Sequence, residues 1–130
     1  MIKYRAWDKG TDLMNKVTVI DFESEEVYYH HWRYGHSEAI NLQDIELMQS
    51  TGLKDKKGVD IFEGDIIEIL DMSGNYINSG IIKQGKGFFY IENYEGNKIT
   101  LLSDFYLKSY TNTLELCVIG NIYKGRGEEN

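Results

Sequence analysis

The sequence predicts a mainly β protein with an antiparallel β-rich N-terminal portion, a small C-terminal β-barrel, and at most one or two short helical turns. Three observations indicate this fold. Residues that favour strands (Val, Ile, Tyr, Phe and Thr) recur in short runs. Gly, Asn, Asp and Ser separate the runs, as tight turns require. No long stretch keeps the apolar period of an amphipathic helix.

The first portion is expected to form a small antiparallel sheet. Residues 1–7 alternate in type and favour an edge strand, with residues 8–12 as its turn. Residues 17–22 and 27–32 are strand-like runs on either side of the polar residues 23–26, which is the pattern of a β-hairpin.

A polar connection separates the two portions. The apolar spacing in residues 38–48 is compatible with a short helix, which only tertiary packing would stabilise. Gly52 and Gly58 then punctuate the chain. We therefore expect an N-terminal β-rich subdomain over residues 1–52 and a C-terminal barrel subdomain over residues 53–130, packed as one compact body.

Apolar runs recur at shorter intervals in the second portion, and five short strands favour a small barrel. The runs are residues 66–70, 81–83, 88–91, 99–102 and 114–119. Their Gly-containing separators tolerate positive φ and so close tight turns. Ser103 begins a stretch suited to a single helical turn before the last strand.

Gly64 and Asp65 are predicted to form a structural turn where a strand begins. Glycine allows a sharp turn, and an aspartate accepts hydrogen bonds from the backbone amides of such a turn. Small SH3-like barrels often enter a strand in this way, so the pair adds support for the barrel.

The composition bounds both partners and location. The chain carries 14 Lys and Arg against 21 Asp and Glu, a formal net charge of −7, which disfavours nucleic-acid binding. No apolar window reaches the roughly 18 residues that span a bilayer, and residues 1–5 lack the apolar stretch of a secretory signal. We therefore expect a cytoplasmic protein that does not contact membranes. The single cysteine, Cys117, cannot form an internal disulfide.

Four spaced blocks of sequence form a pattern that runs from end to end. They read IKYRAWD at residues 2–8, LMQSTGLKD at 47–55, IFEGDII at 61–67 and VIGNIY at 118–123. Together they resemble the YopX family, short proteins encoded mostly by bacteriophages and prophages of Gram-positive bacteria. The resemblance implies a β-rich portion that leads into an SH3-like barrel, and a place in the host bacterial cytoplasm. It implies no activity and no catalytic residues.

No catalytic, metal or cofactor site is predicted. On a strand His30 and His31 point to opposite faces, so at most one of them meets His36, and two ligands are fewer than a zinc site needs. The acidic residues around Asp65 are better explained by turn capping and solvent exposure. Cys117 lies in an apolar run, and no glycine-flanked serine elbow occurs. We therefore expect a protein that is not an enzyme.

Aromatic side chains are the candidate binding groups. Alternate residues of each strand face outward, and exposed Tyr and Trp give broad contact at a low cost in entropy. For any one ring, packing between the two portions is the alternative. The candidate binding surface consists of Tyr28, Trp32, Tyr34, Phe89, Tyr90 and Tyr94.

Two functions follow from these residues. The first is a noncatalytic module that docks onto an unidentified phage or host protein through outward aromatics and an acidic rim. The second is a single-stranded nucleic-acid binder that stacks bases on Phe89 or Tyr90 and contacts phosphates with Lys83 and Lys86, against the adverse net charge. An enzymatic function is a third and remote alternative. Self-association is also open, because unpaired sheet edges and exposed aromatics favour it.

Overall fold

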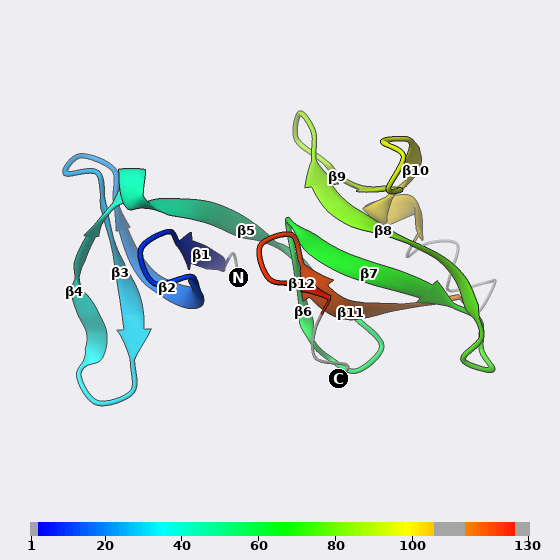
Figure 1. Cartoon of the computed structure of the whole chain (residues 1–130), viewed down its shortest axis with the longest axis horizontal. Coiled ribbons are helices and arrows are strands. Elements are labelled where there is room, and N and C mark those ends of the chain that lie inside the picture. The colour runs from blue at the N-terminus through cyan, green and yellow to red at the C-terminus, as the bar shows by residue number, and fades with distance from the viewer. Residues whose placement is uncertain (1–2, 106–113, 127–130) are drawn as a thin grey trace. The chain divides into compact units, whose positions relative to one another are not determined.

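The computed structural model describes residues 3–105 and 114–126 of the 130-residue chain (Figure 1). The chain divides into two compact units, Met1–Ser50 and Thr51–Asn130. The sequence placed this boundary after residue 52, and the packing of the two portions as one body stays a prediction.

The first unit is an antiparallel meander that ends in a single 3-10 turn and the start of β5. Its elements are β1 (Tyr4–Asp8), β2 (Leu13–Asp21), β3 (Glu26–His31), β4 (Gly35–Asn41), η1 (Leu42–Asp44) and β5 (Ile45–Lys54). The strands lie in the order β4-β3-β2-β1-β5, so β1 is paired on both sides. Strand alternation sends Val27 and Tyr29 of β3 into the core with Ala6 and Ile45.

The second unit begins within β5, whose neighbour in the sheet is β6 (Asp60–Phe62). A further six-stranded sheet follows in the order β10-β9-β8-β7-β11-β12. Its strands are β7 (Asp65–Leu70), β8 (Tyr76–Gln84), β9 (Phe89–Glu92), β10 (Lys98–Leu101), β11 (Glu115–Asn121) and β12 (Gly125–Arg126). Its core is apolar and built mainly from isoleucines, with the buried Ile61, Ile67, Ile82 and Ile91 at its centre.

The mainly β class, with two antiparallel sheets and two short helical turns, is confirmed. Residues 102–105 form one of these turns, and its Leu102 and Phe105 side chains enter the core of the second unit. Residues 38–48, where a helix was compatible, form mostly strand around η1, because pairing with β3 and β1 outweighs local spacing. The strands of the second sheet follow one another in a linear order from β10 to β12. A closed SH3-like barrel stays a prediction.

Seven turns in the described chain share one device, a side-chain acceptor on the first residue. In the first form this acceptor binds the backbone amides two and three residues later, and the fifth residue of the turn has a positive φ. Turns of this form start at Asp8, Asp21, His31 and Asn121. In the second form the acceptor binds the amides two and four residues later, and the fourth residue is a glycine with φ near +85°. These turns start at Asp55, Asp71 and Asn93.

Gly64 and Asp65 lie at the turn between β6 and β7. Gly64 has a φ of +88°, its amide donates to the Ile82 carbonyl at 2.8 Å, and its carbonyl accepts from Ile122 at 2.9 Å. Asp65 is buried, and its Oδ2 accepts the Phe62 amide at 2.8 Å. These bonds tie the start of β7 to β8 and to the turn after β11, so both residues serve the fold.

A buried hydrogen bond joins β3 to the end of β1 across β2. The Tyr29 hydroxyl donates to Asp8 Oδ2 at 2.8 Å, while Asp8 Oδ1 accepts the Gly10 and Thr11 amides at 2.8 and 3.1 Å. The Tyr29 bond, chiefly, holds the pKa of the Asp8 carboxyl below its ordinary value, against the opposite effect of burial. Burial first, and Asp8 second, raise the pKa of Tyr29.

Replacing Tyr29 with Phe is expected to lower the free energy of unfolding of the first unit by about 1.5–3 kcal/mol at pH 7, because Asp8 loses a charge-assisted bond. In the wild type, ionised Asp8 stabilises the fold above its ordinary pKa of 3.8, and this contribution is lost as pH falls through the lower folded pKa. The variant should show a weaker loss over that range. Urea unfolding followed by tryptophan fluorescence tests this, since Trp7 and Trp32 both lie in the first unit.

Tyr28→Phe is the matched control, because Tyr28 lies on the same strand and faces the opposite side from Tyr29. Equal unfolding free energies for the wild type and both variants would show that the Tyr29–Asp8 bond does not stabilise the unit.

Candidate functional site

The six predicted aromatic residues lie in two places. Tyr28, Trp32 and Tyr34 belong to the β3–β4 hairpin of the first unit, and Phe89, Tyr90 and Tyr94 belong to β9 and the turn after it. Trp32 is 82% exposed, Tyr34 71% and Tyr94 53%, whereas the other three are half-buried.

The β3–β4 turn is closed by an imidazole. His31 Nδ1 accepts the backbone amides of Arg33 at 3.1 Å and Tyr34 at 3.2 Å, and Gly35 completes the turn with a φ of +88°. In the other six turns of this kind an Asp or Asn oxygen does this work. Since Nδ1 accepts, the neutral ring carries its proton on Nε2.

The same imidazole orders the aromatic side chains around it. The His31 ring stacks on Tyr34, with centroids 5.0 Å apart and planes at 24°, and on Trp32 at 5.9 Å and 17°. The Arg33 guanidinium carbon lies 5.5 Å from the centroid of the Tyr34 ring. We call residues 31–34 the aromatic turn. Two hydrogen bonds close its backbone, and most of the indole is exposed.

Tyr28 and the remaining histidines support the hairpin beside the aromatic turn. His30 and His36 pair directly across β3 and β4, and the Tyr28 ring meets the His36 ring edge-on at 5.4 Å. Within the part of the chain that is described, no three His, Cys, Asp or Glu side chains gather as metal ligands would.

In these turns the residue that follows the acceptor is often exposed to solvent. The sequence analysis did not identify this pattern. Five of these second positions hold large apolar side chains that are at least 44% exposed. They are Phe22, Trp32, Met72, Tyr94 and Ile122. The spacing of Asp or Asn from a later glycine was a usable signal for most of these turns, but the role of His31 was not visible in that pattern.

The second unit carries a smaller aromatic group. Phe88 and Tyr90 lie 5.8 Å apart, and the Lys98 ammonium sits 5.1 and 4.8 Å from their centroids. Phe89, between them in sequence, packs instead against the core. Lys83, predicted to contact phosphate, lies 4.0 Å from a Glu92 carboxylate oxygen. Phe88, which was not in the predicted set, therefore replaces Phe89 on the outer face.

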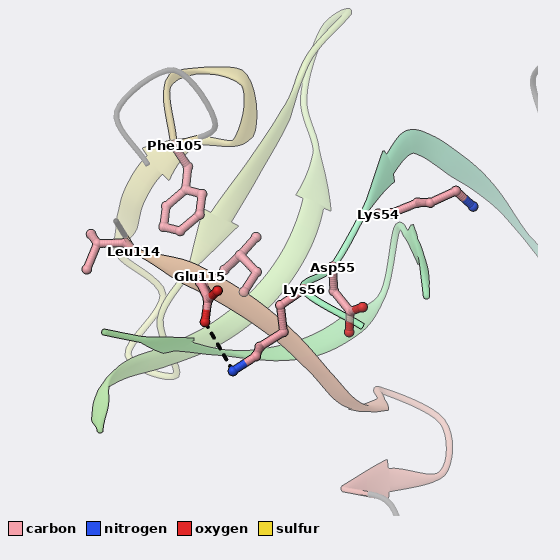
Figure 2. A pocket seen from close by; sticks show the side chains of 7 residues that line it. Lys54, Asp55, Lys56, Phe105, Leu114 and Glu115 are labelled. Atoms are coloured by element: carbon pink, nitrogen blue, oxygen red, sulfur yellow. Dashed lines mark ion pairs between the residues drawn. The ribbon is translucent and has the colours of Figure 1, made fainter. Parts of the chain in front are cut away.

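A shallow hollow of about 140 Å³ lies beside Asp55 in the second unit, and Figure 2 shows its lining. The Lys56 ammonium pairs with Glu115 Oε1 at 3.1 Å. Asp55 Oδ1 accepts two amides of its own turn, and its Oδ2 accepts the Val118 amide at 3.0 Å. The hollow is below the roughly 300 Å³ at which ligand pockets begin, and the Asp55 carboxylate is engaged by the backbone.

The model of the YopX protein family matches residues 3–125. The chain belongs to the YopX family. This confirms the resemblance drawn from the four sequence blocks. The family membership names no reaction and no ligand, so the aromatic turn is the candidate site on structural grounds alone.

The YopX fold is also seen in a solved structure. The crystal structure of protein EF1440 from Enterococcus faecalis is similar over 95% of this chain and 94% of that chain, with 27% sequence identity and a TM-score of 0.65. No curated protein matches the chain at a significant level. No helix in the described residues is long and apolar enough to cross a membrane.

Replacing Asp55 with Asn is expected to destabilise the second unit by about 1–3 kcal/mol. The asparagine side chain has one acceptor oxygen. Either the two backbone amides of the turn or the Val118 amide would then face the N–H group of that side chain. Urea unfolding followed by circular dichroism measures the loss, and faster hydrogen exchange at Val118 locates it. Asp71→Asn in an exposed turn of the same form is the control and should cost less, because the second oxygen of Asp71 accepts only the exposed side-chain amide of Asn75, which can turn to water. Equal losses would contradict the role given to the Val118 bond.

Replacing His31 with Ala is expected to open the aromatic turn, whereas His31→Asn should keep it closed. Alanine removes the acceptor of the Arg33 and Tyr34 amides, and asparagine restores it as in the turn that starts at Asn121. Hydrogen exchange of these two amides should be about fivefold faster in the alanine variant, which corresponds to about 1 kcal/mol. Fast exchange in both variants would show that the imidazole stack, and not the acceptor, holds the turn.

Proposed function

We propose that this YopX protein is a noncatalytic module that binds another protein, of phage or host origin, through the aromatic turn. One observation carries the proposal. Trp32 is 82% exposed, yet its ring is stacked on an imidazole whose Nδ1 closes the turn beneath it. The exposed indole thus lies against a ring that two backbone hydrogen bonds hold in place.

The physical argument concerns the free-energy cost of ordering side chains when a partner binds. Single exposed apolar side chains are common and need no function. Binding becomes favourable when large aromatic groups are already ordered, because ordering a free side chain costs about 0.5–1.5 kcal/mol. Trp, Tyr and Arg are also the residues that contribute most to binding at protein interfaces, and the aromatic turn holds one of each.

The acidic rim that the sequence led us to expect around the docking surface does not lie at the aromatic turn. Asp21, Glu23 and Glu25 occupy the β2–β3 turn, at the opposite end of β3 from the aromatic turn. The docking surface we propose is therefore aromatic and cationic, without that rim. A noncatalytic role is supported by the buried aspartates Asp55 and Asp65, which accept backbone amides.

The second candidate, single-stranded nucleic-acid binding, has one observation in its favour. Lys98 lies over Phe88 and Tyr90, which places a cation beside rings suited to stacking. Two facts weigh against it. Phe89 packs against the core, and the nearby Lys83 is paired with Glu92.

Affinity capture from phage-infected or lysogenic Gram-positive cells tests the protein-binding proposal. The full chain is compared with a Trp32→Ala/Tyr34→Ala variant and with Phe22→Ala, an equally exposed aromatic on the β2–β3 turn. We expect a stoichiometric partner that the wild type and Phe22→Ala retain, that the double variant loses, and that nuclease leaves in place. Retention by all three proteins would contradict the role of the aromatic turn, and loss on nuclease treatment would favour the nucleic-acid candidate.

A further inference from the structure

We propose that the aromatic turn takes an acidic segment of its partner, in which carboxylates alternate with apolar side chains. This inference rests on the proposed function and names the chemistry of the partner at that site. It is carried by the local charge, by two hydrogen-bond donors, and by the two exposed rings beside them.

The local charge around the aromatic turn is opposite to that of the chain. The formal net charge is −7, with 21 acidic residues, yet residues 27–37 contain no Asp or Glu. The same stretch contains Arg33 and all three histidines of the protein. Charges beyond about 8–10 Å are largely screened at physiological salt, so a ligand at this turn meets mainly the local field.

Arg33 provides the first donor. Its side chain is exposed, and no ion pair joins it to a carboxylate of the described residues. The guanidinium carbon lies 5.5 Å from the centroid of the Tyr34 ring. A planar guanidinium is suited to a carboxylate, which it binds through two parallel hydrogen bonds.

His31 provides the second donor. The turn amides occupy Nδ1, so the neutral ring carries its proton on Nε2, for which no partner occurs among the described residues. An Asp at this position, as in the turn that starts at Asp21, would instead add a negative charge. The fold therefore presents an N–H donor here where the related turns present carboxylates or amides.

The rings of Trp32 and Tyr34 supply the apolar part of the surface. Both are more than 70% exposed, and they flank Arg33 in the chain. A partner segment that alternates acidic and apolar residues matches donors and rings in turn. Nucleic acid fits less well, because its affinity grows with the number of phosphates neutralised and this turn has one permanent cation.

Fluorescence anisotropy with the full chain tests the inference. The probes are a labelled decapeptide of alternating Glu and Leu, a matched Gln–Leu decapeptide, and a ten-residue oligo-dT. We expect the Glu–Leu peptide to bind most tightly and to weaken with salt. Arg33→Gln should weaken it about tenfold, equivalent to about 1.4 kcal/mol, Trp32→Ala should weaken it at least as much, and Phe22→Ala should leave it unchanged.

Equal affinity for the Glu–Leu and Gln–Leu peptides, or wild-type affinity in Arg33→Gln, would overturn the acidic segment. Preferential binding of oligo-dT would also overturn it, and would assign the surface to nucleic acid. Cell capture separates this failure from that of the proposed function. A captured protein that depends on Trp32, but is neither displaced by the Glu–Leu peptide nor lost in Arg33→Gln, would refute the acidic segment and leave protein binding intact.

Discussion

The acceptance of turn amides by the first side chain of seven turns in the described residues is the interaction on which the structure depends. The chain has no proline to stiffen its connections. In such a protein the turns set the register, and a slip of one residue would move every side chain of a strand to the other face. Seven side-chain acceptors fix those turns in the described residues, and Gly64 and Asp65 fix the β6–β7 junction in a related way. The packed cores follow from the register that these bonds impose.

The same constraint explains where large apolar side chains are displayed. In an acceptor turn the first residue points its side chain back at the amides, and the second residue lies at the outer corner of the chain. Phe22, Trp32 and Met72 occupy that corner and are all more than 70% exposed. Exposure alone therefore reflects turn geometry. What distinguishes Trp32 is the ring beneath it, since the acceptor there is aromatic and stacks on both Trp32 and Tyr34.

Local pattern was sufficient for the mainly β class, for the hairpin of residues 17–32 and for the turn at Gly64, because these depend on alternation and on residues that tolerate positive φ. It was insufficient where long-range pairing decided the outcome. Residues 38–48 have helix-compatible spacing but pair with strands distant in sequence. Phe88 and Phe89 are adjacent aromatics, and only the register of β9 against β8 decides that Phe89 meets the core while Phe88 lies outside. The ring contacts of His31 are likewise made within a turn that Gly35 completes with a positive φ.

The choice of histidine at position 31 links stability to recognition. Three kinds of acceptor close the seven turns, and they differ in what remains after the amides are bound. An aspartate leaves a negative charge, and an asparagine leaves a small amide with no ring for stacking. A histidine leaves an N–H donor and an aromatic plane on which neighbouring rings can stack. Only the last combination makes a turn that is closed, aromatic and free of negative charge on a protein whose net charge is −7. The residue that completes the backbone of the hairpin is thus also the one that determines which chemistry its tip can bind.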